Sequence, residues 1–168
     1  VGATLPDDTE ITREGYTFAG WYMNSNYDGV AIEEISTTDF GDKTYYAKWK
    51  VNSYDVTLNT DGGTINSGNI TSYTYGVGAT LPTDVTKTGF TFLGWYNNSS
   101  CSGYPVLSIA SNVADDKEFW AKWDTINYTI TYNANEGAFA TTPANSYKYG
   151  DEVILPTPTR EGYTFAGW

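Results

Sequence analysis

The clearest alternation of apolar and polar residues lies in the middle of the chain, where it begins with a predicted hairpin. In "YDVTLNT" (54–60), the Tyr, Val and Leu side chains face one way and Asp, Thr and Asn the other. This is the pattern of a strand with one buried face. The segment 61–69 is rich in Gly and Asn, so it allows a reversal into "ITSYTYG" at 70–76. We therefore predict a long hairpin.

A third strand is predicted for "GFTFLGWY" at 89–96. Strict alternation divides its residues between two faces, with Phe90, Phe92 and Gly94 on one and Thr91, Leu93 and Trp95 on the other. A glycine inside a strand marks a bulge or a close approach of another backbone, and we expect one of these at Gly94.

The remainder of this region predicts a loop and a last strand. "PVLSIAS" at 105–111 is expected to form a loop with one helical turn. In "EFWAKW" at 118–123, Phe119, Ala121 and Trp123 alternate with Trp120 and Lys122. This alternation predicts a fourth strand with one buried face.

These elements recur at a period of about 74 residues. Three tryptophans follow a glycine at equivalent places, namely Trp21, Trp95 and Trp168. The segment "AKW" occurs twice and ends at Trp49 and Trp123, 74 residues apart. A unit of this length is too long for a solenoid coil and suits a small folded domain. We divide the chain into 1–50, the C-terminal part of a first repeat, 51–123, a complete middle repeat, and 124–168, the N-terminal part of a third.

Composition agrees with a β-rich fold and restricts the partners. Aromatic residues make up 17% of the chain, with 15 Tyr, 7 Phe and 6 Trp. Together with Thr and Val, such residues suit a pleated, half-buried surface. We predict a mainly β fold of tandem small domains with little helix. The net charge of −11 argues against binding to nucleic acid, and no apolar run is long enough to insert into a membrane.

The repeated motifs resemble the Listeria–Bacteroides repeat family, also called the internalin B-repeat. Its hallmarks are "Y-x-V-x-F/L-N", "G-Y-T-F-x-G-W-Y" and a closing "Y-A-K-W". The residues that carry the resemblance are Gly15, Tyr16, Phe18, Gly20, Trp21, Trp49, Gly89, Phe90, Phe92, Gly94, Trp95, Trp123, Gly162, Tyr163, Phe165, Gly167 and Trp168. Phe90 stands where the family has Tyr, and Trp120 precedes the middle "AKW". The resemblance implies a β-grasp-like domain, repeated in tandem on bacterial surface and secreted proteins as a stalk, spacer or adhesive module.

The residues available for catalysis argue against an enzyme. The chain contains no His, which removes the commonest general base and every Ser–His or Cys–His arrangement. Two adjacent carboxylate pairs could be proposed for glycoside hydrolysis, Glu33–Glu34 and Asp115–Asp116. Neighbours on an extended segment point apart, so solvated surface charge is the better interpretation. We predict no catalytic and no cofactor-binding residue.

Metal and thiol chemistry are also disfavoured. "NTDGG" (59–63) and "NANEGA" (133–138) place oxygen side chains near Gly, but neither has the spacing of an EF-hand loop. Turn formation explains both segments, and we predict no metal site. Cys101 is the only cysteine, so no internal disulfide can form, and we expect a loop residue.

Three aromatic residues are candidates for contact with a ligand, namely Tyr27, Tyr104 and Trp120. They differ between repeats and lie in predicted loops or on the face opposite the core. A core or structural role is the default for the other aromatics. Lys48 and Lys122 share one place in the last strand, where a strand-edge role competes with a covalent cross-link to Asn.

Taken together, the sequence predicts a non-enzymatic stalk segment of a large bacterial cell-surface or secreted protein, such as an adhesin. The links "KVNS" and "DTIN" have four residues each, so neighbouring repeats should form a semi-rigid rod. The alternative is that the repeats themselves bind a host glycan or protein. We expect the chain to be a window of a longer array. A filament made by strand donation between the two ends is disfavoured, because both ends bring the same third strand.

Overall fold

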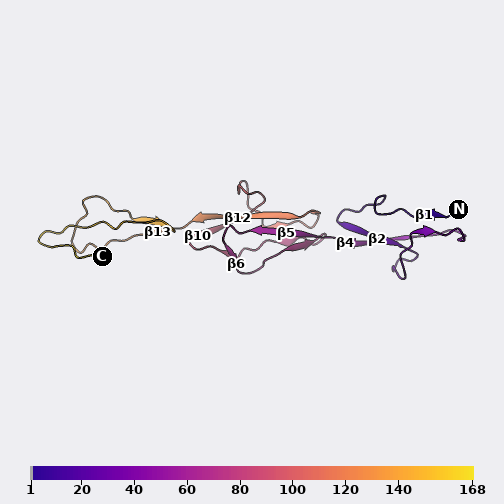
Figure 1. Ribbon diagram of the computed structural model, residues 1–168. Coiled ribbons are helices and arrows are strands. Elements are labelled where there is room, and N and C mark those ends of the chain that lie inside the picture. The colour runs from indigo at the N-terminus through magenta and orange to yellow at the C-terminus, as the bar shows by residue number, and fades with distance from the viewer. Residues whose placement is uncertain (1) are drawn as a thin grey trace.

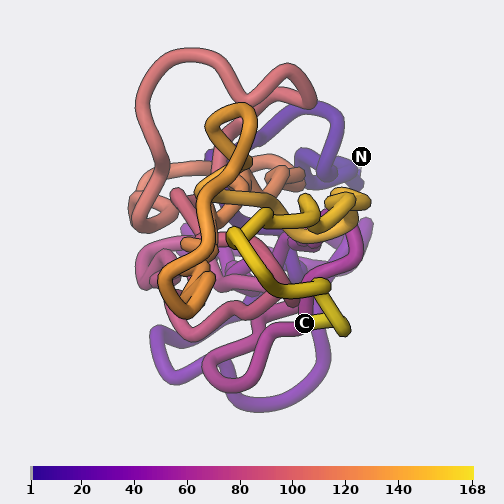
Figure 2. Tube along the Cα trace, turned by 90° about the vertical axis from the view of Figure 1, so that its left-hand side faces the viewer, coloured from indigo at the N-terminus to yellow at the C-terminus, as the bar shows by residue number. Residues whose placement is uncertain are grey.

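The computed structural model describes residues 2–168, which form strands and turns and contain no helix. Three units follow one another along a single axis, with the two termini at opposite ends (Figure 1). Figure 2 looks along this axis, with the C-terminal unit in front of the others. The prediction of a mainly β repeat protein is confirmed.

The middle unit contains a four-stranded sheet. Its strands are β5 (Ser53–Asn59), β7 (Ser72–Thr74), β10 (Phe90–Tyr96) and β12 (Lys117–Thr125), and their order is β10-β12-β5-β7. β5 forms the predicted antiparallel hairpin with β7, and β12 pairs antiparallel with β10. β5 and β12 are parallel, so the first and last strands of the unit lie side by side at its centre.

Two short strand pairs complete the middle unit. β6 (Thr64–Ile65) pairs with β9 (Val85–Thr86), and β8 (Ala79–Thr80) pairs with β11 (Ser108–Ile109). The helical turn predicted for 105–111 is therefore wrong. Extended backbone at β11 buries the β-branched side chain of Ile109 in the core and pairs it with Ala79 across the ladder.

The flanking units contain parts of the same plan. The first has β1 (Ala3–Thr4), β2 (Tyr16–Tyr22), β3 (Glu34–Ile35) and β4 (Tyr46–Val51), and the third has β13 (Asn127–Thr129) and β14 (Ser146–Lys148). The pair β2–β4 corresponds to β10–β12, β1–β3 to β8–β11, and β13–β14 to β5–β7. The repeat is thus present in strand pairing as well as in sequence.

One face of the central sheet packs into the core. The buried residues of this core come from the sheet and from the segments that cover it, and they are Val56, Tyr73, Leu81, Val85, Trp95, Ile109, Phe119 and Ala121. The predicted alternation holds for β5 and β12, where Val56, Phe119 and Ala121 point inward. Only 2% of the Trp95 surface is exposed, which makes it the most buried large side chain of the core.

The two predicted faces of the third strand are wrong after Phe92. The register of β10 against β12 shifts between Phe92 and Gly94, so Leu93 is an extra residue in a bulge. Trp95 consequently returns to the face of Phe92, and the two rings are 5.5 Å apart. The expectation for Gly94 is confirmed, since it sits at the bulge with φ of 121°. A Cβ there would lie 2.8 Å from Cβ of Pro105.

Each repeat ties its Gly-Trp tryptophan to the carbonyl of an earlier proline. The indole Nε1–H of Trp95 donates to Pro82 at 2.7 Å. The corresponding distances are 2.6 Å from Trp21 to Pro6 and 2.8 Å from Trp168 to Pro156. The buried indole N–H of Trp95 needs an acceptor, and this bond provides it. The bond explains why Leu-Pro and Gly-Trp recur together.

Trp95→Ala should lower the free energy of unfolding of the middle unit by about 3–5 kcal/mol, because it leaves a cavity in the core. Urea unfolding followed by circular dichroism measures this loss. The control is Trp120→Ala, which removes a half-buried ring from the opposite face and should cost about 1–2 kcal/mol. A loss below about 1 kcal/mol for Trp95→Ala would show that this ring does not hold the core.

Stability above pH 10 should depend on Tyr73. Burial raises the pKa of its phenol above the ordinary value of 10.0. The folded state therefore favours the neutral phenol. The resulting contribution to the free energy of unfolding is complete below about pH 10 and is lost as the pH rises through the raised pKa. Above about pH 10 the wild-type chain should lose stability more steeply than Tyr73→Phe, whose ring cannot ionise. Parallel urea midpoints for the two chains would contradict this, and Tyr104→Phe, at an exposed ring, should follow the wild type.

Candidate functional site: the joint between repeats

Successive repeats are joined by single residues. β4 ends at Val51 and β5 begins at Ser53, so Asn52 alone lies between the strands of neighbouring units. Ile126 occupies the same place between β12 and β13. The connections are shorter than the four-residue links predicted from the sequence, because the strands extend into them.

Backbone hydrogen bonds fix the first joint on both sides of Asn52. Its N–H donates to the carbonyl of Gly15 in the first unit at 2.9 Å, and its carbonyl accepts from the N–H of Tyr75 in the middle unit at 3.0 Å. The Thr17 hydroxyl also donates to the Asn52 side-chain oxygen, at 2.6 Å. The linking residue is therefore bonded to both neighbours and has little freedom to rotate.

A tyrosine ring packs directly on a glycine across this joint. A Cβ atom at Gly15 would lie 2.2 Å from Cγ of Tyr75, so only the absence of a side chain allows the contact. Gly15 is buried and has φ of 75°, a conformation that other residues rarely adopt. Tyr75 also meets Tyr16 edge to face, with the ring centres 5.7 Å apart.

The second joint repeats this contact. Ile126 donates its N–H to the carbonyl of Gly89 at 2.9 Å. A Cβ at Gly89, where φ is 80°, would lie 2.2 Å from Cβ of Tyr149. Phe90 and Tyr149 meet edge to face at 6.4 Å. The two joints therefore share the glycine–tyrosine contact. They differ in the linking residue, because the apolar side chain of Ile126 cannot accept a hydrogen bond like the one that Asn52 accepts from Thr17.

The tyrosines and the linking residues of the joints were not predicted from the sequence. Tyr75 and Tyr149 belong to "SYTYG" and "SYKYG", whose repetition gives the signal that could have identified them. Both lie 60 residues after the glycine that they cover, at the same spacing in each joint. Sequence alternation reports contacts inside a strand, whereas this contact joins two different repeats.

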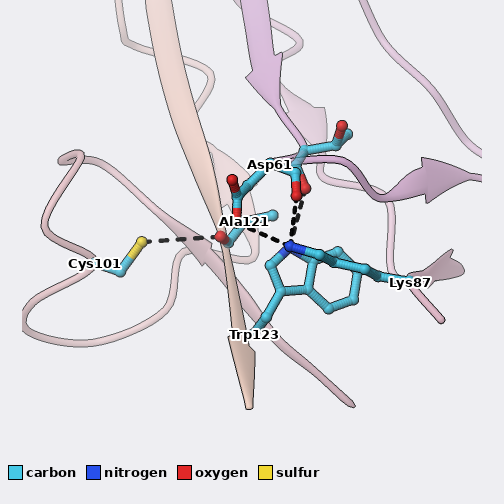
Figure 3. A network of polar contacts seen from close by, with 6 residues as sticks. Asp61, Lys87, Cys101, Ala121 and Trp123 are labelled. Carbon is cyan, nitrogen blue, oxygen red and sulfur yellow. Dashed lines mark hydrogen bonds and ion pairs between the residues drawn. The ribbon is translucent and has the colours of Figure 1, made fainter. Parts of the chain in front are cut away.

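A second set of contacts holds the turn that follows β5 in the middle unit. Lys87 bonds the Asp61 carboxylate at 3.0 Å, and the Trp123 indole donates to the carbonyl of Thr60 at 2.9 Å (Figure 3). Gly63 passes beneath this indole, where a Cβ would lie 2.3 Å from the ring. Asp61 belongs to "NTDGG", the first of the two segments considered as a calcium loop. In the structure its carboxylate pairs with the ammonium group of Lys87.

The second calcium candidate shows the same arrangement. Glu136 forms an ion pair with Arg160, which corresponds to Lys87 in the next repeat. Exposed pairs of this kind stabilise a fold only slightly. Within residues 2–168, no three His, Cys, Asp or Glu side chains gather in a group that could hold a metal ion.

The carboxylate pairs considered for catalysis lie at the surface. The side chain of Asp116 accepts the backbone N–H of Asp55 at 2.8 Å, while Asp115 forms an ion pair with Lys117 at 2.7 Å. Glu33 and Glu34 are exposed, and Glu34 lies in β3. Asp116 therefore has a structural partner, in the strand that opens the unit.

The three candidate ligand-contacting aromatics lie in different surroundings. Tyr104 is 92% exposed in the loop after β10. Tyr27 is 38% exposed and packs edge to face on Tyr22, with the ring centres 5.8 Å apart. Trp120 is half-buried on β12, on the face opposite the core. Of the three, Tyr104 presents the largest free surface.

Lys48 and Lys122 lie over aromatic rings. The Nζ atoms are 5.0 Å from the Tyr22 ring and 4.8 Å from the Tyr96 ring, respectively. Lys122 also donates to the carbonyl of Cys101 at 2.9 Å, and the Cys101 thiol points to the carbonyl of Ala121 (Figure 3). Each lysine therefore has a cation–π contact in its own unit.

Comparison with known proteins places these features in a family. The Listeria-Bacteroides repeat domain matches residues 1–48, 54–122 and 128–168. A protein of Evansella cellulosilytica that is named a membrane protein is 30% identical over 165 residues, which cover 98% of this chain and 24% of that protein. A second protein of this organism, named a Gly-rich membrane protein, is 29% identical over 171 residues, or 99% of this chain and 19% of that protein.

Internalin H of Listeria monocytogenes is 35% identical over 103 residues, which cover 58% of this chain and 17% of that protein. The chain thus spans a quarter or less of the length of these relatives. No solved structure is significantly similar to it. Because the repeat domain matches nearly the whole chain in three stretches, the chain belongs to the Listeria-Bacteroides repeat family.

Proposed function

We propose that this chain is a stalk segment of a larger bacterial surface protein, in which the number of repeats sets the reach of the parts at its ends. The joint carries this proposal. Asn52 and Ile126 are each the only residue between the strands of neighbouring units. Each donates its N–H to the carbonyl of a glycine in the preceding unit, and a tyrosine ring of the following unit packs on that glycine. A spacer must resist folding back on itself, and such joints restrict bending between repeats.

The cell-surface location rests on the relatives. Two of them are named membrane proteins and a third is an internalin. Nothing helical in residues 2–168 is both long and apolar enough to cross a membrane. We propose an extracellular position, with neighbouring repeats of the same longer chain as the immediate partners.

A non-enzymatic role is supported by how the repeated residues are used. The three Gly-Trp tryptophans donate to proline carbonyls, the glycines at the joints admit tyrosine rings, and Asp61 and Glu136 pair with Lys87 and Arg160. The residues that recur between repeats are thus engaged in holding each unit and in joining it to the next.

The length of the array should grow in equal steps as repeats are added. Copies of residues 52–125 can be inserted in frame after Thr125, which preserves every joint. The maximum dimension of each array is then measured by small-angle X-ray scattering. A rod lengthens by the same increment per copy. Growth with about the square root of the copy number, as for a flexible chain, would contradict the proposal. Arrays with a Gly-Ser linker at every joint provide the flexible reference.

One observation favours a second function, binding of a host glycan or protein. Tyr104 is 92% exposed, and a free ring can stack on a sugar. If the repeats adhere directly, the chain should bind a glycan array or host cells saturably, and Tyr104→Ala should abolish this binding. Tyr73→Phe is the matched control, since that ring is buried. Saturable binding lost only in Tyr104→Ala would contradict a role as spacer alone.

A further inference from the structure

We propose that each repeat is built to carry tension along the array, with the parallel pair β5 and β12 as its mechanical clamp. This function goes beyond that of a spacer, because a spacer needs only length and stiffness. It follows from where the chain enters and leaves the unit and from which bonds lie between these two points.

The load enters and leaves through neighbouring strands. The chain enters the middle unit at Ser53, the first residue of β5, and leaves at Thr125, the last residue of β12. Because β5 and β12 are parallel, tension on the two ends pulls the strands in opposite directions along their length. The bonds between them are then loaded in shear and share the force. An antiparallel terminal pair would instead open from one end, bond by bond.

The joints deliver the load without slack. At each joint only one residue lies outside the strands, Asn52 or Ile126, and each donates its N–H to the preceding unit. No flexible segment is available at either joint to extend before the strands are loaded. Tension in β4 therefore passes directly to β5, and tension in β12 passes to β13.

The clamp has side-chain bonds in addition to its backbone ladder. Four positions are paired between the strands, from Lys117 with Val56 to Trp120 with Asn59. The Asn59 amide donates to the Glu118 carboxylate at 2.8 Å and to the carbonyl of Phe119 at 3.3 Å. At the other end, the Asp55 N–H donates to the Asp116 carboxylate at 2.8 Å. These bonds link β5 to β12 at both ends of the paired stretch.

The clamp lies inside the sheet and not at its edge. β7 pairs with the start of β5 and β10 pairs with the end of β12, so each strand of the clamp is also held by a neighbouring strand next to the paired stretch. Beneath it, Val56, Phe119 and Ala121 are buried in the core. Water can replace broken bonds less readily at such a place than at an exposed edge.

Two of the bonding residues recur at the period of the repeat. Asn133 corresponds to Asn59, and Asp42 corresponds to Asp116, each at a separation of 74 residues. Asp42 lies in the first unit and Asn133 in the third, so each flanking unit contains one of these two side chains. A clamp in every repeat suits an array in which each unit bears the same force.

Single-molecule pulling in two directions tests the clamp in the full chain. In a Cys101→Ser background, handles at Asp55→Cys and Asp124→Cys load β5 against β12 in shear. Handles at Asp55→Cys and Asp115→Cys attach to the same end of the pair and peel it open. We expect the unfolding force in shear to be at least about twofold higher, because the four paired positions break together. Equal forces in the two directions would overturn the proposal.

A matched pair of asparagine variants separates the clamp from general stability. Asn59→Ala removes the bonds to β12, whereas Asn66→Ala removes bonds to Asp84 and Thr86, away from the load path. Only Asn59→Ala should lower the shear force, and chemical denaturation shows how far each change weakens the fold. An equal loss of force in both variants, or none in Asn59→Ala, would overturn the clamp. The stalk function would stand, since the length of the array is measured independently.

Discussion

The organisation of this protein depends on a contact that only glycine permits, the packing of a tyrosine ring on the backbone of the preceding repeat. Gly15 under Tyr75 and Gly89 under Tyr149 have no room for a Cβ atom. The carbonyls of the same glycines accept the N–H of the linking residue, so the contact fixes both the separation and the direction of neighbouring units. Strands, cores and turns belong to single repeats, and this contact turns them into an array.

Within a repeat, long-range ties replace the large core that a small domain lacks. Trp95 fills the interior and donates to Pro82, while Trp123 holds the turn after β5 through Thr60. The parallel pairing of β5 with β12 then closes the unit and brings the entering and leaving strands together. The same geometry that completes the fold therefore also places the two joints at the ends of a strand pair inside the sheet.

Alternation predicts the four strands of the central sheet and the buried positions Val56, Phe119 and Ala121, because it depends on neighbours in sequence, and periodicity predicts the repeat. The short pairs β6–β9 and β8–β11 bury Val85 and Ile109 without such an alternation, so they were not predicted. The face of Trp95 is mispredicted, since one extra residue at Leu93 reverses the alternation after it. Gly94 signals that bulge, but it does not reveal which residue is displaced. The joint could not be predicted by these rules, because Tyr75 meets Gly15 across a repeat boundary.

Distance measurement between two repeats tests the central claim, that the joint holds them in one orientation. Spin labels at Thr4→Cys and Thr80→Cys, on the equivalent strands β1 and β8, can be studied by pulsed electron paramagnetic resonance in a Cys101→Ser background. A rigid joint predicts a single narrow distance distribution that broadens when Tyr75→Ala removes the ring from Gly15. A wild-type distribution as broad as that of a chain with a Gly-Ser insertion at Asn52 would contradict the account.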